Sequence, residues 1–386
     1  MTSPSFFFRS SRPTPPTSSF RALIATAVIF WASIVPSITS AETPTDDTLG
    51  VTTWNIEHLG SPGRGFGSGF GGFGRGSIPE RWNELPKRTP EQLKDIGTLI
   101  SKELKSDVIA LQEMAITGRR NGRSICEPLN EIATELGSET KPGQEKPALN
   151  WRYFLPYAEE TPPSDDEKNT HLGFLWNQER VRPLAIFEMT LENQNLAGKA
   201  LFERKPLVGY FEQILPDGSS GVDFVLVNVH LASGQHRDEN HLIAMTLIEF
   251  EITRDLARHA IAESDIIILG DFNDSANNGE ETEDGVPKTS PALIQHMKFK
   301  GYTDLTTPDM GFTRMNSKLT SLIDHIMVNG SAARHLAQET ATIYRPGQGA
   351  RGDSALFADW RATYSDHFPI TFRLALDDDD DRDFFE

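Results

Sequence analysis

Short apolar runs with strand character recur along almost the whole chain, and they limit the possible folds more than any other feature. Each run is bounded by turn-forming or charged residues, which is typical of β-strands in a buried sheet. Helical patterns separate some of these runs but not all, so strand and helix do not alternate strictly. The pattern predicts an α/β protein with mixed sheets rather than a doubly wound parallel sheet. The runs lie at residues 50–55, 108–111, 153–155, 172–176, 224–230, 266–270, 323–328 and 370–374.

Two segments carry helical signals. Thr89 is followed by Pro90 and Gln92, so the threonine can cap the helix, the proline has no amide to satisfy, and the glutamine can close a capping box. Apolar residues then recur at helical spacing as far as Leu104. A longer helix is expected at residues 238–262.

Length and composition favour one large domain. A chain of 386 residues with 38% hydrophobic residues can bury a sizeable core. We find no internal repeat and no change of composition between residues 50 and 374. These residues are therefore assigned to one domain, residues 42–49 to a linker and residues 375–386 to an acidic tail.

The N-terminus has the three parts of a secretory signal peptide. Three arginines precede an apolar run at residues 22–38, and small residues up to Ala41 follow it. A signal anchor that stays in the membrane is the alternative, but Pro36 and the short run favour cleavage after Ala41. The sequence thus predicts a signal peptide at residues 1–41 and a secreted or periplasmic protein.

Cysteine content and charge exclude some classes of protein. Cys126 is the only cysteine, so no intramolecular disulfide can form and burial must stabilise the domain. The formal net charge is −18, which repels a polyanion at long range. This argues against a basic, non-specific nucleic-acid binder, and less against an enzyme whose carboxylates hold a metal.

Polar residues stand at or beside the ends of several of the apolar runs. Each of them alone fits an ordinary loop or turn residue. Together they are expected to meet at one edge of a sheet, where sites are commonly built. They are Asn55, Glu113, His230, Asp271, Asn273, Asp324, Asp366 and His367.

The order of these residues resembles that of the endonuclease/exonuclease/phosphatase superfamily. This group contains deoxyribonuclease I, abasic-site endonucleases, bacterial sphingomyelinases and inositol polyphosphate phosphatases. The resemblance covers roughly residues 50–374. It implies a four-layer α/β/β/α sandwich with two packed mixed β-sheets, and it implies metal-dependent hydrolysis of phosphodiesters.

The resemblance also implies a metal site. Glu113, assisted by Asn55, matches the principal metal position of the family, and Asp366 matches a second acidic position near the metal. Hard oxygen ligands suit Mg²⁺. We therefore expect Mg²⁺ as the cofactor, with Mn²⁺ or Ca²⁺ as alternatives.

Four catalytic positions follow from the same resemblance. Asp324 matches the residue that orients the closing histidine, His367, and a carboxylate behind an imidazole stabilises its charged form. Asp271 and Asn273 are expected to position water and phosphate. Asp271 and His367 both remain candidates for the base that activates water.

Further residues are expected to contact the substrate phosphate. His230, with Asn228 beside it, matches a donor to a phosphate oxygen or to the leaving group. Arg204 resembles a phosphate-contacting arginine, and a surface role is its alternative. His171 lies where relatives carry variable polar residues that contact substrate.

Several features favour a nuclease within the superfamily. Abasic-site endonucleases usually lack a histidine at the position of His230, and inositol phosphatases normally carry Trp and Arg around the position of Asp324, which residues 321–326 lack. A sphingomyelinase-like enzyme remains the alternative, although no long apolar hairpin for entering a membrane is evident. The glycine-rich stretch 60–76 contains phenylalanine and arginine, and it is interpreted as a mobile loop or as a flap that stacks on bases.

A basic loop after Glu113 supports the nuclease interpretation. Arg119, Arg120 and Arg123 lie there with two glycines, and arginines next to a metal carboxylate can clamp flanking phosphates. A solvated loop is the alternative. The sequence thus predicts a secreted, monomeric nuclease that acts on DNA or RNA and has no stable protein partner. The alternative is a secreted sphingomyelinase-like enzyme or inositol-phosphate phosphatase.

Overall fold

The chain divides into two compact units, Met1–Thr43 and Pro44–Glu386, and all residues that the structure describes belong to the second. The structure is a computed structural model. The expected signal peptide, residues 42–47 of the linker, most of the glycine-rich stretch and tail residues 376–386 lie outside the described residues. The described residues are 48–60, 63–64, 85–137, 150–156, 170–191, 195–196, 199–200, 202, 204–232, 238–274, 292–315, 320–346 and 354–375.

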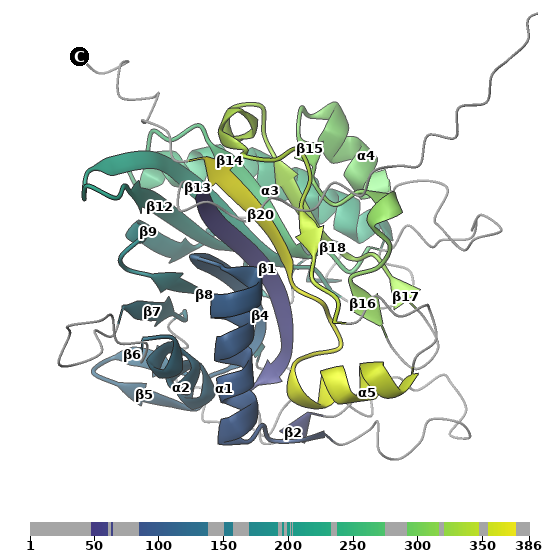
Figure 1. Cartoon of the computed structure of the whole chain (residues 1–386). Coiled ribbons are helices and arrows are strands. Elements are labelled where there is room, and N and C mark those ends of the chain that lie inside the picture. Colours follow the sequence, from purple (N-terminus) through teal and green to yellow (C-terminus); the bar gives the residue numbers. More distant parts are fainter. Residues whose placement is uncertain are drawn as a thin grey trace, which may run out of the picture. The chain divides into compact units, whose positions relative to one another are not determined.

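The first large sheet has the strand order β19-β20-β1-β4-β8-β7. β1 runs parallel to β4 and antiparallel to β20, which lies beside it in Figure 1. Strands from both ends of the domain therefore meet in one sheet. The bounds are β1 (Thr48–Leu59), β4 (Val108–Ala115), β7 (Trp151–Phe154), β8 (Thr170–Asn177), β19 (Thr342–Ile343) and β20 (Ile370–Ala375).

The second large sheet has the strand order β15-β18-β14-β13-β12-β9. β13 and β14 are parallel, and the other neighbours are antiparallel. This sheet is thus also mixed, as the sequence predicts. The bounds are β9 (Val181–Glu188), β12 (Leu207–Ile214), β13 (Ser220–His230), β14 (Ile266–Asp271), β15 (Thr303–Asp304) and β18 (Asp324–Val328).

Short two-stranded sheets are also present in the described part of the chain. The pair that matters for the site is β5 (Gly118–Arg120) with β6 (Arg123–Ile125), because it directly follows β4. The others are β2 (Gly63–Arg64) with β3 (Leu85–Pro86), β10 (Asn195–Leu196) with β11 (Lys199–Ala200), and β16 (Arg314–Met315) with β17 (Thr320–Ser321).

Two large sheets pack face to face. Val51, Val108 and Phe174 of the first sheet form one buried cluster with Phe211 and Leu226 of the second. Burial of apolar side chains is the main favourable contribution to folding, and these strands alternate so that one face of each sheet points into this cluster.

Helices cover the two outer faces. α1 (Pro90–Thr98), α2 (Glu127–Leu136) and α5 (Ser354–Thr363) pack their apolar residues on the first sheet. α3 (Asp238–Arg258) and α4 (Ala292–Phe299) do the same on the second sheet. The domain is therefore the four-layer α/β/β/α sandwich that the resemblance implies (Figure 1).

The cap expected at Thr89 is confirmed. The Thr89 hydroxyl accepts a hydrogen bond from the Gln92 amide at 3.3 Å, and the Gln92 side chain accepts one from the Thr89 amide at 2.9 Å. The end expected for the second helix is wrong, because α3 stops at Arg258 rather than at residue 262. The chain turns there through Ala260 (φ 56°), and the Ile261 amide bonds the Leu256 carbonyl. No helix in the described part of the chain is long and apolar enough to cross a membrane.

Candidate active site

Strand ends from both sheets bring the candidate residues to one edge. Asn55 lies opposite Gln112 near the ends of the parallel strands β1 and β4. His230 and Asp271 are opposite each other at the ends of the parallel strands β13 and β14, and Asp324 faces Asp271 where the antiparallel strand β18 begins. The sheet topology therefore explains why residues so distant in sequence meet.

A bulge in β1 turns the chain just after Asn55. The register with β4 shifts there, and both Glu57 (φ 46°) and His58 (φ 52°) adopt the left-handed region, which L-residues rarely occupy. The Glu57 carboxylate forms a buried ion pair with Arg361, and Arg88 donates to the Glu57 carbonyl at 3.2 Å. These contacts hold the bulge and direct His58 towards the site.

Glu113 is the carboxylate at the centre of the first half of the site. Asn55 Nδ2 donates to Glu113 Oε1 at 3.0 Å and to Asp271 Oδ2 at 3.0 Å. His58 Nε2 lies 3.4 Å from Glu113 Oε2, and His230 Nε2 lies 3.9 Å from Oε1. One carboxylate is thus flanked by an amide and two imidazoles.

Electrostatics keep this carboxylate charged. Burial acts to raise the pKa of Glu113, but His58, Arg204 and the hydrogen bond from Asn55 outweigh it and hold the pKa well below its ordinary value. Burial and the Arg204 charge lower the pKa of His230. At neutral pH the site therefore contains an ionised Glu113 and a neutral His230.

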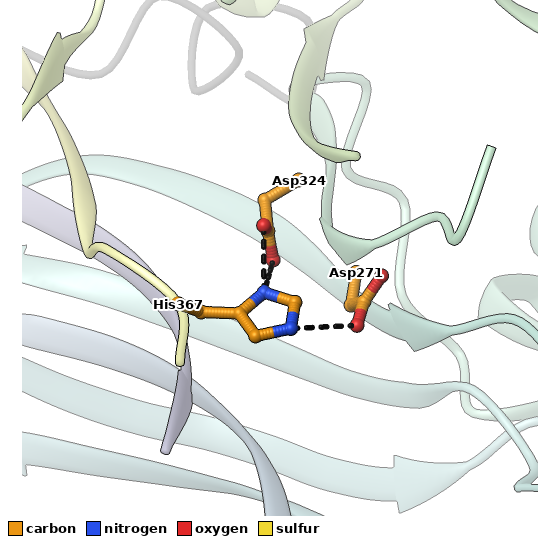
Figure 2. Close-up of side chains that lie close together, drawn as sticks. All are labelled: Asp271, Asp324 and His367. Carbon is orange, nitrogen blue, oxygen red and sulfur yellow. Dashed lines mark hydrogen bonds and ion pairs between the residues drawn. The ribbon is translucent and has the colours of Figure 1, made fainter. Parts of the chain in front are cut away.

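His367 and Asp324 form a buried pair, shown in Figure 2. His367 Nδ1 lies 2.8 Å from Asp324 Oδ2, and its Nε2 lies 3.7 Å from Asp271 Oδ2. Burial acts to lower the pKa of His367, but Asp324, Asp366 and Asp271 outweigh it and raise the pKa to about 10. The imidazole is therefore protonated, with Nε2 directed at Asp271.

Asp271 lies between the two histidines. Its Oδ2 is 3.6 Å from His230 Nε2 and 3.7 Å from His367 Nε2. Burial and the neighbouring Asp324 raise the pKa of Asp271 to about 7. A carboxylate with a pKa near neutrality is suited to general base catalysis.

Local backbone geometry holds Asp271 in place. Gly270 has φ 141°, and a Cβ there would lie 2.0 Å from the Val229 carbonyl oxygen, so only glycine fits. The Asn273 amide donates to Asp271 Oδ1 at 2.8 Å, while the Asn273 side chain donates to the Leu231 carbonyl at 2.7 Å. Asn273 therefore supports the loop that carries Asp271.

Asp366 is paired with an arginine that the sequence analysis did not select. Arg314 Nε donates to Asp366 Oδ2 at 3.2 Å, and Asp366 Oδ1 lies 3.8 Å from His367 Nε2. Burial acts to raise the pKa of Asp366, but Arg314 and His367 outweigh it and lower the pKa. Asp366 is therefore a second ionised carboxylate in the site.

The donor atoms present fit a divalent metal ion. Potential ligand atoms of Asp271, Asp324 and His367 all lie within 4.8 Å of one another. Both Asp324 oxygens already bond His367 Nδ1, so this trio is better arranged to hold a proton than an ion. Glu113, ionised and flanked by further donors, is the better anchor for a metal.

The remaining expected substrate residues lie in three different environments. Arg204 donates to the Thr170 hydroxyl, and its charge lowers the pKa of Glu113. His171 is half-buried on β8, and burial lowers its pKa. Arg119, Arg120 and Arg123 are exposed on the β5–β6 hairpin. Their contacts with substrate stay predictions.

Asn228 occupies the interface between the sheets. Its Nδ2 donates to the Leu111 and Gly173 carbonyls at 3.0 Å each, and its Oδ1 accepts from Gln112 Nε2 at 2.7 Å. The side chain is fully buried. This arrangement gives Asn228 a structural role that joins β13 to β4 and β8, and the expected phosphate contact stays a prediction.

Two residues of the site, His58 and Arg314, were not expected from the sequence. His58 follows Asn55 by three residues in Asn-Ile-Glu-His. It reaches the site only because of a bulge whose left-handed residues are not glycines, so the sequence does not indicate the bulge. Arg314 lies on the two-residue strand β16, which has no alternating pattern. Proximity to Asn55 was the one available signal for His58, and we find none for Arg314.

Comparison with known proteins identifies the family. A model of the Endonuclease/Exonuclease/phosphatase family matches residues 52–367. The chain belongs to this family. Its members hydrolyse phosphoester bonds and generally depend on a divalent metal. None of the curated proteins matches this chain.

Two solved structures are similar to this chain. The catalytic domain of human Nocturnin, solved with a bound sulfate, is 11% identical, with 86% of this chain and 96% of that chain covered and a TM-score of 0.50. A mannosyl-6-phosphatase from Bacteroides thetaiotaomicron is 14% identical, with 85% and 99% covered and a TM-score of 0.49. At such identities the likeness to Nocturnin concerns the fold alone.

Proposed function

We propose that this chain is a metal-dependent phosphodiesterase, an exported nuclease that cleaves DNA or RNA by in-line attack of an activated water. One observation carries the proposal. β4 delivers the ionised Glu113 into the site and leads directly into the β5–β6 hairpin, which exposes Arg119, Arg120 and Arg123 to solvent. A hydrolytic centre beside an exposed basic hairpin suits a substrate with several phosphates in a row.

Glu113 and Asp366 would hold the metal, with His58 and His230 next to Glu113. When bound, a divalent ion neutralises charge on the phosphate oxygens and stabilises the leaving oxygen. Arg314 keeps Asp366 ionised and in place. Asn55 fixes the distance between the metal carboxylate and Asp271, because one amide nitrogen donates to both.

We assign the role of general base to Asp271. Its pKa near 7 allows it to accept a proton from water at neutral pH, whereas His367 already carries a proton and cannot accept another. Water oxygen then bonds to phosphorus as the bond to the leaving oxygen breaks. The protonated His367 stabilises the charge that develops, and Asp324 stabilises that imidazolium.

A substrate panel tests this proposal. The purified protein is incubated with plasmid, linear DNA, RNA, sphingomyelin, inositol phosphates and a small phosphodiester reporter, each with Mg²⁺, Mn²⁺ or Ca²⁺. We expect cleavage of polynucleotides and of the reporter, and loss of both in chelator. Cleavage of sphingomyelin or inositol phosphates without cleavage of any polynucleotide contradicts the nuclease assignment.

We also propose export with cleavage after Ala41, which rests on the tripartite N-terminus. The test is mass spectrometry of protein expressed in a bacterial host and recovered from the periplasm or medium. We expect a new N-terminus next to Ala41. Recovery of an unprocessed cytoplasmic product that begins at Met1 contradicts export.

A further inference from the structure

We propose that His58 is a direct ligand of the metal at Glu113, which makes the site a mixed nitrogen and oxygen site that prefers Mn²⁺ and similar transition ions over Mg²⁺ and Ca²⁺. The proposal rests on the metal dependence proposed above. It adds a ligand that neither the family motif nor the sequence pattern assigns, and it changes the expected order of metal preference.

The position of the imidazole relative to Glu113 is the first argument. His58 Nε2 lies 3.4 Å from Glu113 Oε2. Asn55 donates to the other carboxylate oxygen, Oε1. Adjacent ligand atoms around an ion at about 2.1 Å lie about 3 Å apart. Nε2 and Oε2 therefore stand close to the spacing of two neighbouring ligands of one ion.

The environment of the ring is the second argument. The His58 side chain is 20% exposed. Its Nδ1 is buried and has no hydrogen-bond partner among the residues that the structure describes. Nδ1 is thus closed off, and Nε2 is the ring nitrogen that faces the carboxylate.

The backbone supplies the third argument. His58 adopts a left-handed conformation, and so does Glu57 before it. Such conformations persist only where surrounding contacts enforce them, and they concentrate at functional sites. Arg361 binds the Glu57 carboxylate, and Arg88 donates to the carbonyls of Ile56 and Glu57. Two buried arginines therefore hold the bulge that directs His58 at Glu113.

The chemistry of the donors gives the metal preference. Mg²⁺ and Ca²⁺ take oxygen ligands almost exclusively, whereas imidazole suits transition ions. Glu113 has a second imidazole at 3.9 Å, that of His230, but this ring is nearly fully buried and also faces Asp271. His58 is therefore the better placed of the two to bind an ion. The simpler alternative is that His58 and Glu113 form only an ion pair.

Metal binding to the full-length protein, measured without substrate, separates these alternatives. We first record pulsed electron paramagnetic resonance of the Mn²⁺-loaded wild type, in which a directly bound imidazole gives nitrogen modulation. We expect this modulation in the wild type and its loss in His58→Asn. Asparagine is chosen because it tolerates the left-handed region and is too short to replace the ring. A wild-type spectrum without bound nitrogen overturns the proposal, whatever the variant does.

Affinities measured by calorimetry give the second readout. Removal of residues that merely support a ligand typically costs about 10–100-fold in metal affinity, so loss of a ligand in His58→Asn should weaken Mn²⁺ binding by at least about 10-fold. Mg²⁺ binding should change little. Unchanged or tighter Mn²⁺ binding overturns the proposal and indicates the ion pair alone.

Two control variants complete the test. His296→Gln removes a half-buried histidine of α4 that bonds Thr246, away from Glu113, and it should leave Mn²⁺ binding unchanged. His230→Gln should keep the nitrogen modulation that His58 supplies. Modulation that persists in His58→Asn and disappears in His230→Gln would assign the nitrogen to His230 and overturn the proposal. None of these readouts depends on the substrate, so a failure here is distinct from a failure of the nuclease assignment.

Discussion

Asn55 connects the two halves of the site with a single nitrogen atom. Its Nδ2 donates to Glu113, which belongs to the first sheet, and to Asp271, which belongs to the second. Its Oδ1 accepts the Glu57 amide and so fixes the orientation of the amide group. The distance between the carboxylate that anchors a metal and the carboxylate that takes a proton thus depends on one residue.

Replacement of Glu113 by glutamine tests the metal anchor. The change removes an ionised ligand with little change of shape, so we expect activity on a small phosphodiester to fall by at least about 100-fold, beyond the cost typical of groups behind a ligand. Initial rates with Mg²⁺ and Mn²⁺, alongside a thermal melt that shows an intact fold, measure this. Full activity of the folded variant in chelator contradicts the assignment.

Asp324 controls the charge of His367. In Asp324→Asn the imidazole loses the anion that most strongly raises its pKa, so the pKa should fall from about 10 towards the ordinary value of 6.5. A proton-NMR titration of the metal-free protein measures this, and the His367→Gln variant identifies the resonance. If the His367 resonance of Asp324→Asn still titrates above pH 9, which is about one unit below the wild-type pKa, the role assigned to Asp324 is contradicted.

Strand ends position the chemistry at the scale of the elements. Glu113, His230 and Asp271 terminate or nearly terminate strands that lie in two parallel pairs. The β5–β6 hairpin continues from one of these ends. Changes in the loops that follow these strands therefore alter the surroundings of the site without moving the strands that hold its residues.

The arginine hairpin is expected to bind phosphates that flank the cleaved bond. Replacement of Arg119, Arg120 and Arg123 by alanine should raise KM for a long polynucleotide and lower the slope of log binding against log salt by up to about 2–3. Hydrolysis of a small diester reporter should change little, because the reporter reaches only the metal centre.

A charge-matched control separates this effect from net charge. Arg182 lies on β9, Lys298 lies on α4 and Arg334 lies within residues 332–335, all outside the sheet from which the hairpin continues, and their replacement by alanine removes the same charge. This control should keep the wild-type KM. Equal loss on polynucleotide and reporter in the hairpin variant means that the hairpin supports the site instead of binding the strand.

Sequence patterns predict central strands and caps because local chemistry determines them. β4, β13 and β14 each contain a continuous apolar run, and the Thr89 cap depends on neighbouring residues alone. The sequence pattern did not indicate β9 or β12 as strands. β9 is half-exposed and contains Pro183, and Gly209 interrupts the apolar residues of β12. The space beside Gly209 is filled by Phe211 and Phe174, a packing relation between sheets that no local pattern records.

The same distinction applies to the site. Asn55, Glu113, Asp271 and His367 could be selected because they stand beside recognisable strands. His58 could not, since a left-handed bulge with no glycine determines its direction. Its contact with Glu113 is visible only once the bulge and its supporting arginines are known.

At the scale of the whole molecule, acidic side chains outside the site are also buried, and Glu263 is one of them. Glu263 is buried, its carboxyl interacts with Asp223, and it accepts the Asp265 amide. Burial and Asp223 raise the pKa of Glu263 to about 10, from an ordinary value of 4.5. The folded protein therefore keeps a proton that the unfolded chain releases at much lower pH.

The contribution of Glu263 to stability should consequently decrease as pH rises. Between about pH 4.5 and 10 the unfolded chain binds fewer protons at this position than the folded protein, so the free energy of unfolding falls with pH. Glu263→Gln removes this dependence and should raise Tm at neutral pH by a few degrees, roughly. Thermal melts across this pH range measure it, with exposed Glu131→Gln as control. A wild-type slope retained in Glu263→Gln contradicts the expectation.

The return of β20 to the side of β1 has a consequence for biosynthesis. β20 pairs with β1 along six registered positions, and the Thr52 and Thr371 hydroxyls bond across 319 residues of sequence. Asp366 and His367 lie just before this strand. A ribosome that has synthesised the other described strands of the two large sheets has therefore still not synthesised these two residues. The site therefore lacks the Asp366 carboxylate and the His367 imidazole until the segment before β20 has been synthesised and β20 has paired with β1.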